Sequence, residues 1–234
     1  ANASSGSSFP LTMGADAVVA PAGNDTIVGT LTATGATFSV ADNINGGNGT
    51  DTVTVSSSGT SNSISTVEMT SVEVLNIIDA ATTKTTIDAL SFAGLETLKV
   101  QGSTGAELQV DNLANLVALN LVSNLGSADV VDINYGAAAT IGSSDVQNIT
   151  TSGSARTVEL AGLESANITT SGNASTIILT DTSAADVLAS ITVSGGSALT
   201  LTGTGPTAVS TVNAGSTTAA LTLDVSASTA ATMT

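Results

Sequence analysis

Histidine and cysteine are both absent from this chain of 234 residues, and there is one tyrosine, Tyr135. General acid/base chemistry would therefore depend on carboxylates and hydroxyls alone. Glu68 and Glu73 are close enough in the sequence to suggest a catalytic pair, but charged side chains at exposed strand edges explain them better. We therefore expect no enzyme. The lack of cysteine also suits a protein that is exported unfolded and needs no oxidative folding step.

Positive charge is nearly as scarce. Lys84, Lys99 and Arg156 are the only basic residues, against 19 acidic ones, and the formal net charge is -16. Three cations cannot form a basic patch, which excludes binding to the phosphates of nucleic acid and attraction to an anionic bilayer. A chain this acidic is either simply soluble or adapted to bind divalent cations.

Aromatic side chains make up only 2% of the chain, and there is no tryptophan. No stretch is apolar over the roughly eighteen residues that a membrane-spanning helix needs, so we expect no direct membrane insertion. Hydrophobic residues still make up 41% of the chain, chiefly Ala, Val, Leu and Ile among many Thr and Ser. Small and β-branched side chains of this kind suit a thin core between closely spaced layers.

A short unit of the form Gly-x-Asp-x-apolar recurs near the N-terminus. Its copies are GADAV (14–18), GNDTI (23–27) and GTDTV (49–53), and VADNI (40–44) lacks the glycine. The aspartates of these units are Asp16, Asp25, Asp42 and Asp51. They follow one another at steps of nine, 17 and nine residues. Two nine-residue steps separated by almost twice nine indicate a structural repeat rather than chance.

From about residue 72 onward, two families of alternating apolar segments take turns along the chain. One includes 85–90, 131–135 and 176–180, and the other 72–77, 95–100 and 116–121. Members of each family recur every 18 to 30 residues, with Gly, Ser and Asn turns between them. Repeats of this size are typical of a solenoid. We predict an all-β fold, a parallel β-solenoid or β-helix; the alternative is an antiparallel β-sandwich, which also alternates short strands with turns.

The stretch INGGNGTDTV (44–53) concentrates glycine, asparagine and aspartate before an alternating strand. Within it, GGNGTDTVT (46–54) matches Gly-Gly-x-Gly-x-Asp-x-U-x, with U a large apolar residue, at every defined position. This pattern resembles the calcium-binding nonapeptide of RTX proteins. Glycine tolerates positive φ, so turn carbonyls can point towards a cation, and aspartate supplies the hard anionic oxygen that Ca²⁺ takes in sets of about six to eight.

One nonapeptide cannot fill that coordination sphere, so the ligands must come from turns stacked on one another. We expect Ca²⁺ to be held by the aspartates and glycines of the repeated units: Asp16, Gly23, Asp25, Asp42, Gly46, Gly47, Gly49 and Asp51. The alternative is that these segments are ordinary turns between strands.

Two further surface features have weaker support in the sequence. Four glutamates recur along the later segments and would form an acidic strip that binds more calcium weakly: Glu96, Glu107, Glu159 and Glu164. Ice binding would need a regular Thr-x-Thr ladder, and the sequence offers only separate instances at 52–54 and 200–202.

Longer segments of the N-terminal part are also distinctive. They are FPLTMGADAVVAPAGNDTIVGTL (9–31), INGGNGTDTVTV (44–55), STVEMTSVEVLNI (65–77) and IDALSFAGLETLKV (87–100). Together, over roughly residues 9–100, they resemble a segment of the calcium-binding surface-layer (S-layer) proteins of Gram-negative bacteria. Val72, Glu73, Asn76 and Ile77 fit one element of that pattern. A later element is matched by Leu90, Gly94, Leu95 and Leu98.

This resemblance implies a secreted protein on the cell surface, whose calcium-dependent folding and self-assembly form a two-dimensional lattice. Related segments occur in biofilm-matrix and adhesin proteins exported by type I secretion, which is the alternative function. We expect residues 1–55 to be an RTX-like calcium-binding segment and residues 56–234 to be Thr/Ser/Ala-rich solenoid repeats, both part of a larger protein. The expected partners are further copies of the chain and a cell-surface polysaccharide.

Overall fold

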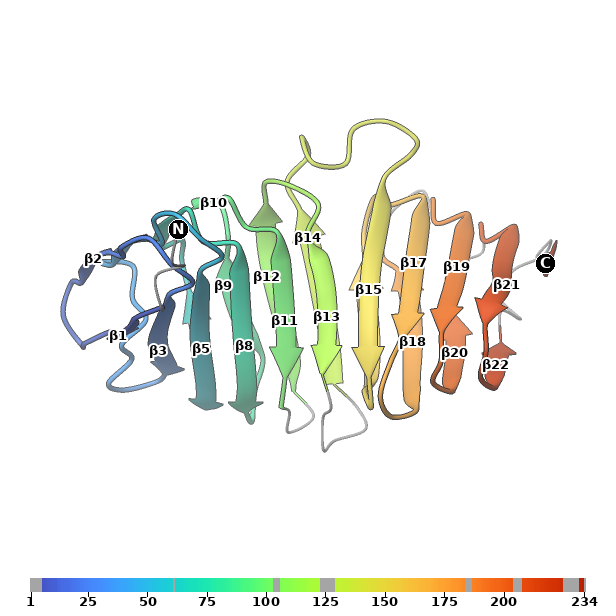
Figure 1. The fold of residues 1–234 in the computed structure, drawn as a ribbon, viewed down its shortest axis with the longest axis horizontal. Coiled ribbons are helices and arrows are strands. Elements are labelled where there is room, and N and C mark those ends of the chain that lie inside the picture. The colour runs from blue at the N-terminus through green and yellow to red at the C-terminus, as the bar shows by residue number, and fades with distance from the viewer. Residues whose placement is uncertain are drawn as a thin grey trace.

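The computed structural model describes residues 6–60, 62–102, 106–122, 129–183, 187–203, 208–224 and 232–233. Every element in these ranges is a β-strand, and all strand pairs are parallel. The strands stack as a β-solenoid of about 8 turns (Figure 1). The predicted parallel β-solenoid is confirmed, and the β-sandwich alternative is wrong.

Sheet A forms one side of the solenoid along its whole length and contains 11 strands. In spatial order they are β1 (Ser8–Pro10), β3 (Thr26–Thr32), β5 (Thr52–Gly59), β8 (Val74–Ala81), β11 (Thr97–Gln101), β13 (Ala118–Val122), β15 (Val146–Ser152), β17 (Ser165–Thr170), β19 (Ser190–Gly195), β21 (Thr211–Thr217) and β23 (Thr232–Met233). In Figure 1 this sheet faces the viewer, with its strands nearly parallel from β3 to β21.

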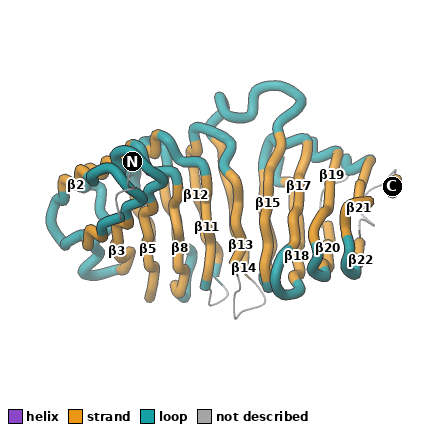
Figure 2. Tube along the Cα trace, in the orientation of Figure 1, coloured by secondary structure: helices purple, strands orange, loops and turns teal. Residues whose placement is uncertain are grey.

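Sheet C forms the opposite side, with 8 strands. They are β6 (Asn62–Ile64), β9 (Thr85–Asp88), β12 (Glu107–Leu113), β14 (Asp129–Tyr135), β16 (Ala155–Leu160), β18 (Ser175–Asp181), β20 (Leu199–Gly203) and β22 (Leu221–Asp224). Sheet B adds a third side near the N-terminus with β2 (Ala17–Val19), β4 (Asn43–Asn45), β7 (Glu68–Thr70) and β10 (Phe92–Ala93). After β10, loops take the place of sheet B in the described turns (Figure 2).

The core forms because side chains alternate along each strand, so that every second residue points inside. Successive turns then place apolar residues on top of one another: Val53 pairs with Leu75, and Leu75 pairs with Leu98. All three are fully buried and belong to one hydrophobic core that runs through the stack. Small aliphatic side chains are enough to fill this core because the sheets on opposite sides of the coil lie close together.

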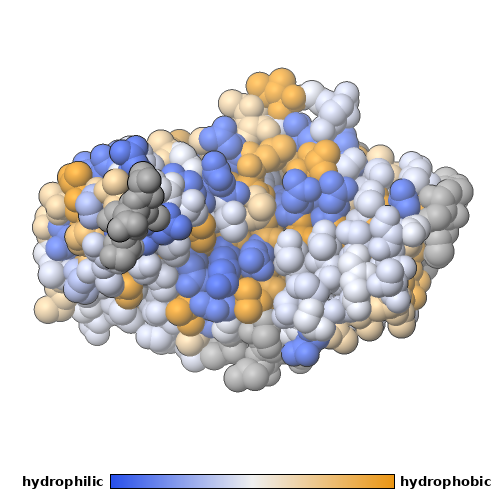
Figure 3. Space-filling model, in the orientation of Figure 1, coloured by the Kyte–Doolittle hydropathy of each residue, from blue (hydrophilic) through white to orange (hydrophobic). Residues whose placement is uncertain are grey.

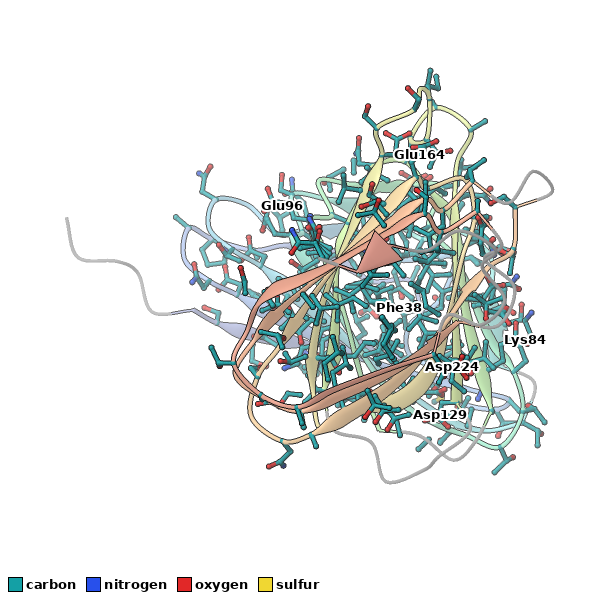
Figure 4. All side chains as sticks on the ribbon, turned by 90° about the vertical axis from the view of Figure 1, so that its right-hand side faces the viewer. Phe38, Lys84, Glu96, Asp129, Glu164 and Asp224 are labelled. Atoms are coloured by element: carbon teal, nitrogen blue, oxygen red, sulfur yellow. The ribbon has the colours of Figure 1, made fainter. Side chains whose placement is uncertain are left out.

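One large side chain fills the core where a strand is missing. The segment between β3 and β4 has no sheet C strand, and Phe38 lies there fully buried. Looking along the solenoid, Figure 4 shows Phe38 inside the coil, with Lys84 and Asp224 on the sheet C side. A Cβ on Gly29 would come within 3.0 Å of Phe38 Cβ, so the close approach of Phe38 leaves no room for a larger residue at this position of β3.

A buried arginine braces the corner between sheets A and C. The guanidinium of Arg156 donates a hydrogen bond of 2.7 Å to the carbonyl of Gly102, 54 residues away, and one of 3.1 Å to Ser154 Oγ. Burial lowers the pKa of Arg156, and the nearby carboxylates of Asp129 and Asp79 oppose that shift. The charge is therefore held inside by carboxylates and by a carbonyl of an earlier turn.

Sheet A runs without a break across residue 55, the expected limit of the calcium-binding segment, because β5 spans it and pairs with β3 and β8. The described residues contain no helix of the length and hydropathy needed to cross a membrane.

Candidate metal centre

An acidic residue immediately precedes each of four successive sheet A strands. Asp25, Asp51, Glu73 and Glu96 stand before β3, β5, β8 and β11. Their backbones are stacked by hydrogen bonds between turns: the N–H of Thr52 donates to the carbonyl of Asp25 at 2.9 Å, and later turns repeat this bond. These four residues are called the acidic column below.

The carboxylates of the acidic column also bond along the stack. Asp51 Oδ1 accepts the backbone N–H of Asp25 at 2.7 Å, and Glu73 Oε2 accepts the N–H of Asp51 at 2.7 Å. Asp25 Oδ1 accepts the N–H of Ser7 in the same way. Asp25, Asp51 and Glu73 thus each use one oxygen to hold the preceding turn.

The second oxygens of Asp25 and Asp51 have no such partner. Asp25 is 1% exposed and Asp51 is 0% exposed, and Oδ2 of each is buried without a hydrogen bond. Burial raises the pKa of Asp51; the hydrogen bond from Asp25 lowers it, and the charges of Glu73 and Asp25 raise it further. Burying a carboxylate costs several kcal/mol, and a single hydrogen bond offsets only part of that cost. Two carboxylates in this situation, Asp25 and Asp51, lie in adjacent turns.

Asp16 and Asp42 form a separate pair at another corner of the coil, before β2 and β4 of sheet B. Asp42 Oδ1 accepts the N–H of Asp16 at 3.0 Å, and Asp42 Oδ2 accepts the N–H of Ser39 at 2.7 Å. Asp16 Oδ2 accepts the N–H of Thr12 at 2.7 Å. Asp16 Oδ1 accepts a hydrogen bond from the Thr12 hydroxyl at 3.1 Å, so all four carboxylate oxygens of this pair already have a partner.

The structure explains the spacing of the four aspartates. A step of nine residues leads from one corner to the next within a turn, and a step of 26 residues leads to the same corner of the next turn. The coil therefore places the four aspartates as two stacked pairs, Asp16 with Asp42 and Asp25 with Asp51, rather than at one centre.

The glycines of the motif allow the turns to approach closely. Gly23, Gly47 and Gly49 have φ of 140°, 88° and 151°. A Cβ on Gly49 would lie 1.8 Å from the carbonyl oxygen of Gly23, in the turn below it. At Gly46, a Cβ would lie 1.9 Å from the carbonyl oxygen of Ser71 and 2.9 Å from Asp51 Oδ2. The carbonyl of Ser71 and the free oxygen of Asp51 therefore lie on the same side of Gly46.

The residues present fit a hard cation in part. Asp25 Oδ2, Asp51 Oδ2 and the carbonyl of Ser71 are the oxygen ligands this corner offers, and Ca²⁺ takes about six to eight oxygens, including carbonyls and waters. Within the described ranges, no three acidic side chains gather closely enough to hold a metal without such neutral ligands. A cation at this corner would therefore be held by carboxylates from two stacked turns together with backbone carbonyls and water.

Sequence reasoning missed Glu73 as a member of the acidic column. The available signal was its place directly before an alternating strand, which Asp25 and Asp51 share. The column resumes further along: Asp145 and Glu164 precede β15 and β17, and Glu164 Oε2 accepts the N–H of Asp145 at 2.8 Å.

The expected strip of four glutamates is divided between two places. Glu96 and Glu164 lie at the corner of the acidic column (Figure 4), whereas Glu107 and Glu159 belong to sheet C strands. They do not form one strip.

No pocket opens between the described side chains. No protein-family model, curated protein or solved structure matches the chain. The assignment of a function therefore depends on the chemistry of the site and on the sequence resemblance.

Proposed function

We propose that the chain is a structural segment of an extracellular protein that folds upon binding calcium and assembles with copies of itself into a surface layer. The observation that carries the proposal is the pair of buried, unpartnered oxygens Asp25 Oδ2 and Asp51 Oδ2 in stacked turns. A divalent cation beside them would remove their mutual repulsion and the penalty for burying them.

Calcium would then act as a source of folding free energy. The residues that would hold it are Asp25 and Asp51, with the carbonyl of Ser71 among the neutral ligands. The turn is assembled only when the chain has coiled, so the unfolded chain has no preformed site. Export into a calcium-rich medium would favour folding outside the cell.

The lattice and the extracellular location come from the resemblance to S-layer proteins. The alternative, a calcium-dependent biofilm-matrix or adhesin module, is favoured by the elongated stack of turns (Figure 1), which suits a stalk. Both functions share the calcium step and differ in assembly: ordered sheets for the first, single or fibrous molecules for the second.

The calcium step is tested by thermal unfolding of chelator-treated protein, monitored by circular dichroism with and without Ca²⁺. At a free concentration of about 100 times Kd, binding stabilises the fold by about 2.7 kcal/mol. For a chain of this size, that corresponds to a rise in Tm of roughly 5–11 °C. We expect Asp51→Asn and Asp25→Asn each to remove most of this rise.

Glu68→Gln is the matched control, because it removes one negative charge from an exposed position on β7 outside the acidic column. It should leave the calcium-induced rise intact. Equal Tm values with and without Ca²⁺ in the wild type would rule out the calcium step, and Mg²⁺ at the same concentration tests whether any divalent ion suffices. Electron microscopy of the calcium-loaded protein then distinguishes sheets from isolated stalks.

A further inference from the structure

The outer face of sheet A differs from the rest of this acidic molecule. Asp79 is the only acidic residue in its strands, and Asp79 points inside, where it is 4% exposed and accepts a hydrogen bond from Ser57 Oγ. Among the sheet A side chains that the structure describes, Lys99 of β11 is the only charged one on the outer face. By contrast, six carboxylates point outward from sheet C: Asp88, Glu107, Asp111, Asp132, Glu159 and Asp224.

The side chains on this face form regular columns. Thr150 pairs in register with Thr169, and Thr169 with Ser194; the hydroxyls of Thr169 and Ser194 lie 3.2 Å apart. In the neighbouring column, Asn167 donates a hydrogen bond of 3.1 Å to the amide oxygen of Asn148. Figure 3, in which sheet A faces the viewer, shows a surface of mostly intermediate hydropathy over β15 to β21, with a hydrophilic patch in its upper part.

We propose that this face is the contact through which the chain binds a second copy of itself, sheet A against sheet A, about a two-fold axis that runs along the stack. The proposal rests on the self-assembly part of the proposed function and names its surface. Two copies that each carry a net charge of -16 repel one another. Contact through sheet A buries no carboxylate, whereas contact through sheet C would desolvate several.

The size of the face is sufficient for such a contact. Nine strands from β3 to β21 span roughly 40 Å at a spacing of about 4.8 Å, and five residues of strand span about 17 Å. The resulting flat area of roughly 650 Å² approaches the ~800 Å² per partner of a standard interface.

The two-fold axis along the stack is favoured by the acidic column. The column borders sheet A at the edge where its strands begin. Rotation about an axis along the stack puts the columns of the two copies at opposite edges of the interface and keeps their charges apart. The same rotation places each turn opposite its own copy, so β17 lies against β17 with the two strands running in opposite directions.

Charge substitutions at Thr169 test the contact. Thr169→Glu and Thr169→Lys should each weaken self-association at least roughly tenfold, because the two copies then carry like charges in the same turn, close to the axis. Mixing the two variants in equal amounts should restore association. Thr200→Glu on sheet C is the matched control, since its in-register neighbours Thr176 and Thr222 are also hydroxyl residues; it should associate like the wild type. Sedimentation velocity over a concentration series measures association, and circular dichroism confirms that each variant is folded.

Other patterns would overturn the contact. If Thr169→Lys strengthened association, the face would be binding an acidic surface rather than its own copy. If Thr200→Glu alone weakened association, sheet C would be the contact. A wild type that stays monomeric while Ca²⁺ raises its Tm would overturn this inference and leave the calcium step standing. Association that follows the expected variant pattern without any effect of Ca²⁺ would support the contact and overturn the calcium step instead.

Discussion

The role of an acidic residue in this protein depends on the corner of the coil at which its turn places it. Asp42 bonds backbone N–H groups with both of its oxygens, whereas Asp51 leaves one oxygen buried and free. Asp79 points into the coil and accepts hydrogen bonds from hydroxyls. The residue type is the same, but of these three aspartates Asp51 is the one whose position, like that of Asp25, leaves a buried oxygen that a cation could neutralise.

Glycine at position 49 is required by both conformation and space, and replacing it should show this. Gly49→Ala introduces strain of about 1–2 kcal/mol from its positive φ. It also places Cβ 1.8 Å from the carbonyl oxygen of Gly23, which adds an overpacking penalty of about 1–3 kcal/mol. Urea unfolding measures the loss. Gly59→Ala is the control, because Gly59 also has positive φ (78°) but no atom within 4 Å of the new Cβ. Gly59→Ala should lose only the part of the unfolding free energy that comes from backbone strain. Equal losses in Gly49→Ala and Gly59→Ala would contradict the steric explanation.

At the scale of elements, strand pairing brings together charges that are distant in the sequence. Asp132 of β14 and Glu159 of β16 are partners in register on the outer face of sheet C. Asp132 Oδ2 accepts hydrogen bonds from Gln109 at 2.8 Å and Asn134 at 3.1 Å, so its charge is stabilised. Burial raises the pKa of Glu159, and the charges of Asp132 and Glu107 raise it further, while Lys84 lowers it.

This pair predicts a dependence of stability on pH. The folded-state pKa of Glu159 exceeds that of the unfolded chain, so the folded state binds the extra proton between the two values. The contribution of Glu159 to the free energy of unfolding should therefore rise as the pH falls from 7 through the range between its folded and unfolded pKa values. Glu159→Gln should be more stable than the wild type at pH 7 and gain less on acidification. Tm measured in steps from pH 7 to pH 4 tests this, with Glu68→Gln as control; an unchanged pH profile in Glu159→Gln would contradict it.

At the scale of the whole molecule, the solenoid has one core to which every turn contributes. A turn contacts mainly the turns on either side of it, so the loss of packing in a middle turn affects both neighbours. The same corner can therefore hold a column of carboxylates over several turns without interrupting the apolar stack beside it.

Truncating a core residue in the middle of the stack should therefore be costly. Leu98→Ala removes a fully buried side chain that lies between Leu75 and Leu119 and should lower the free energy of unfolding by about 2–5 kcal/mol. Leu90→Ala makes the same substitution at a side chain that is 64% exposed and should change it by less than about 0.5 kcal/mol. Denaturant unfolding measures both, and similar values for the two variants would contradict a continuous core.

Much of the fold could be predicted from the sequence because its signals are local. Alternation of apolar residues indicated strands, recurrence at 18 to 30 residues indicated a solenoid, and the glycines indicated the turns between them. The strands of the two similar segments TVT (52–54) and TLT (200–202) lie in sheets A and C, on opposite sides of the coil. Their likeness in sequence says nothing about which side they occupy.

The sequence by itself determined the all-β character, the stacked turns and the concentration of carboxylates in glycine-rich segments, because alternation and turn chemistry depend only on neighbouring residues. Only the tertiary structure decided which residues stand above one another. Turns differ in length, so Asp25 and Asp51 stack across 26 residues while Asp51 and Glu73 stack across 22. Counting along the chain cannot supply that register, because it is fixed by hydrogen bonds and packing between turns.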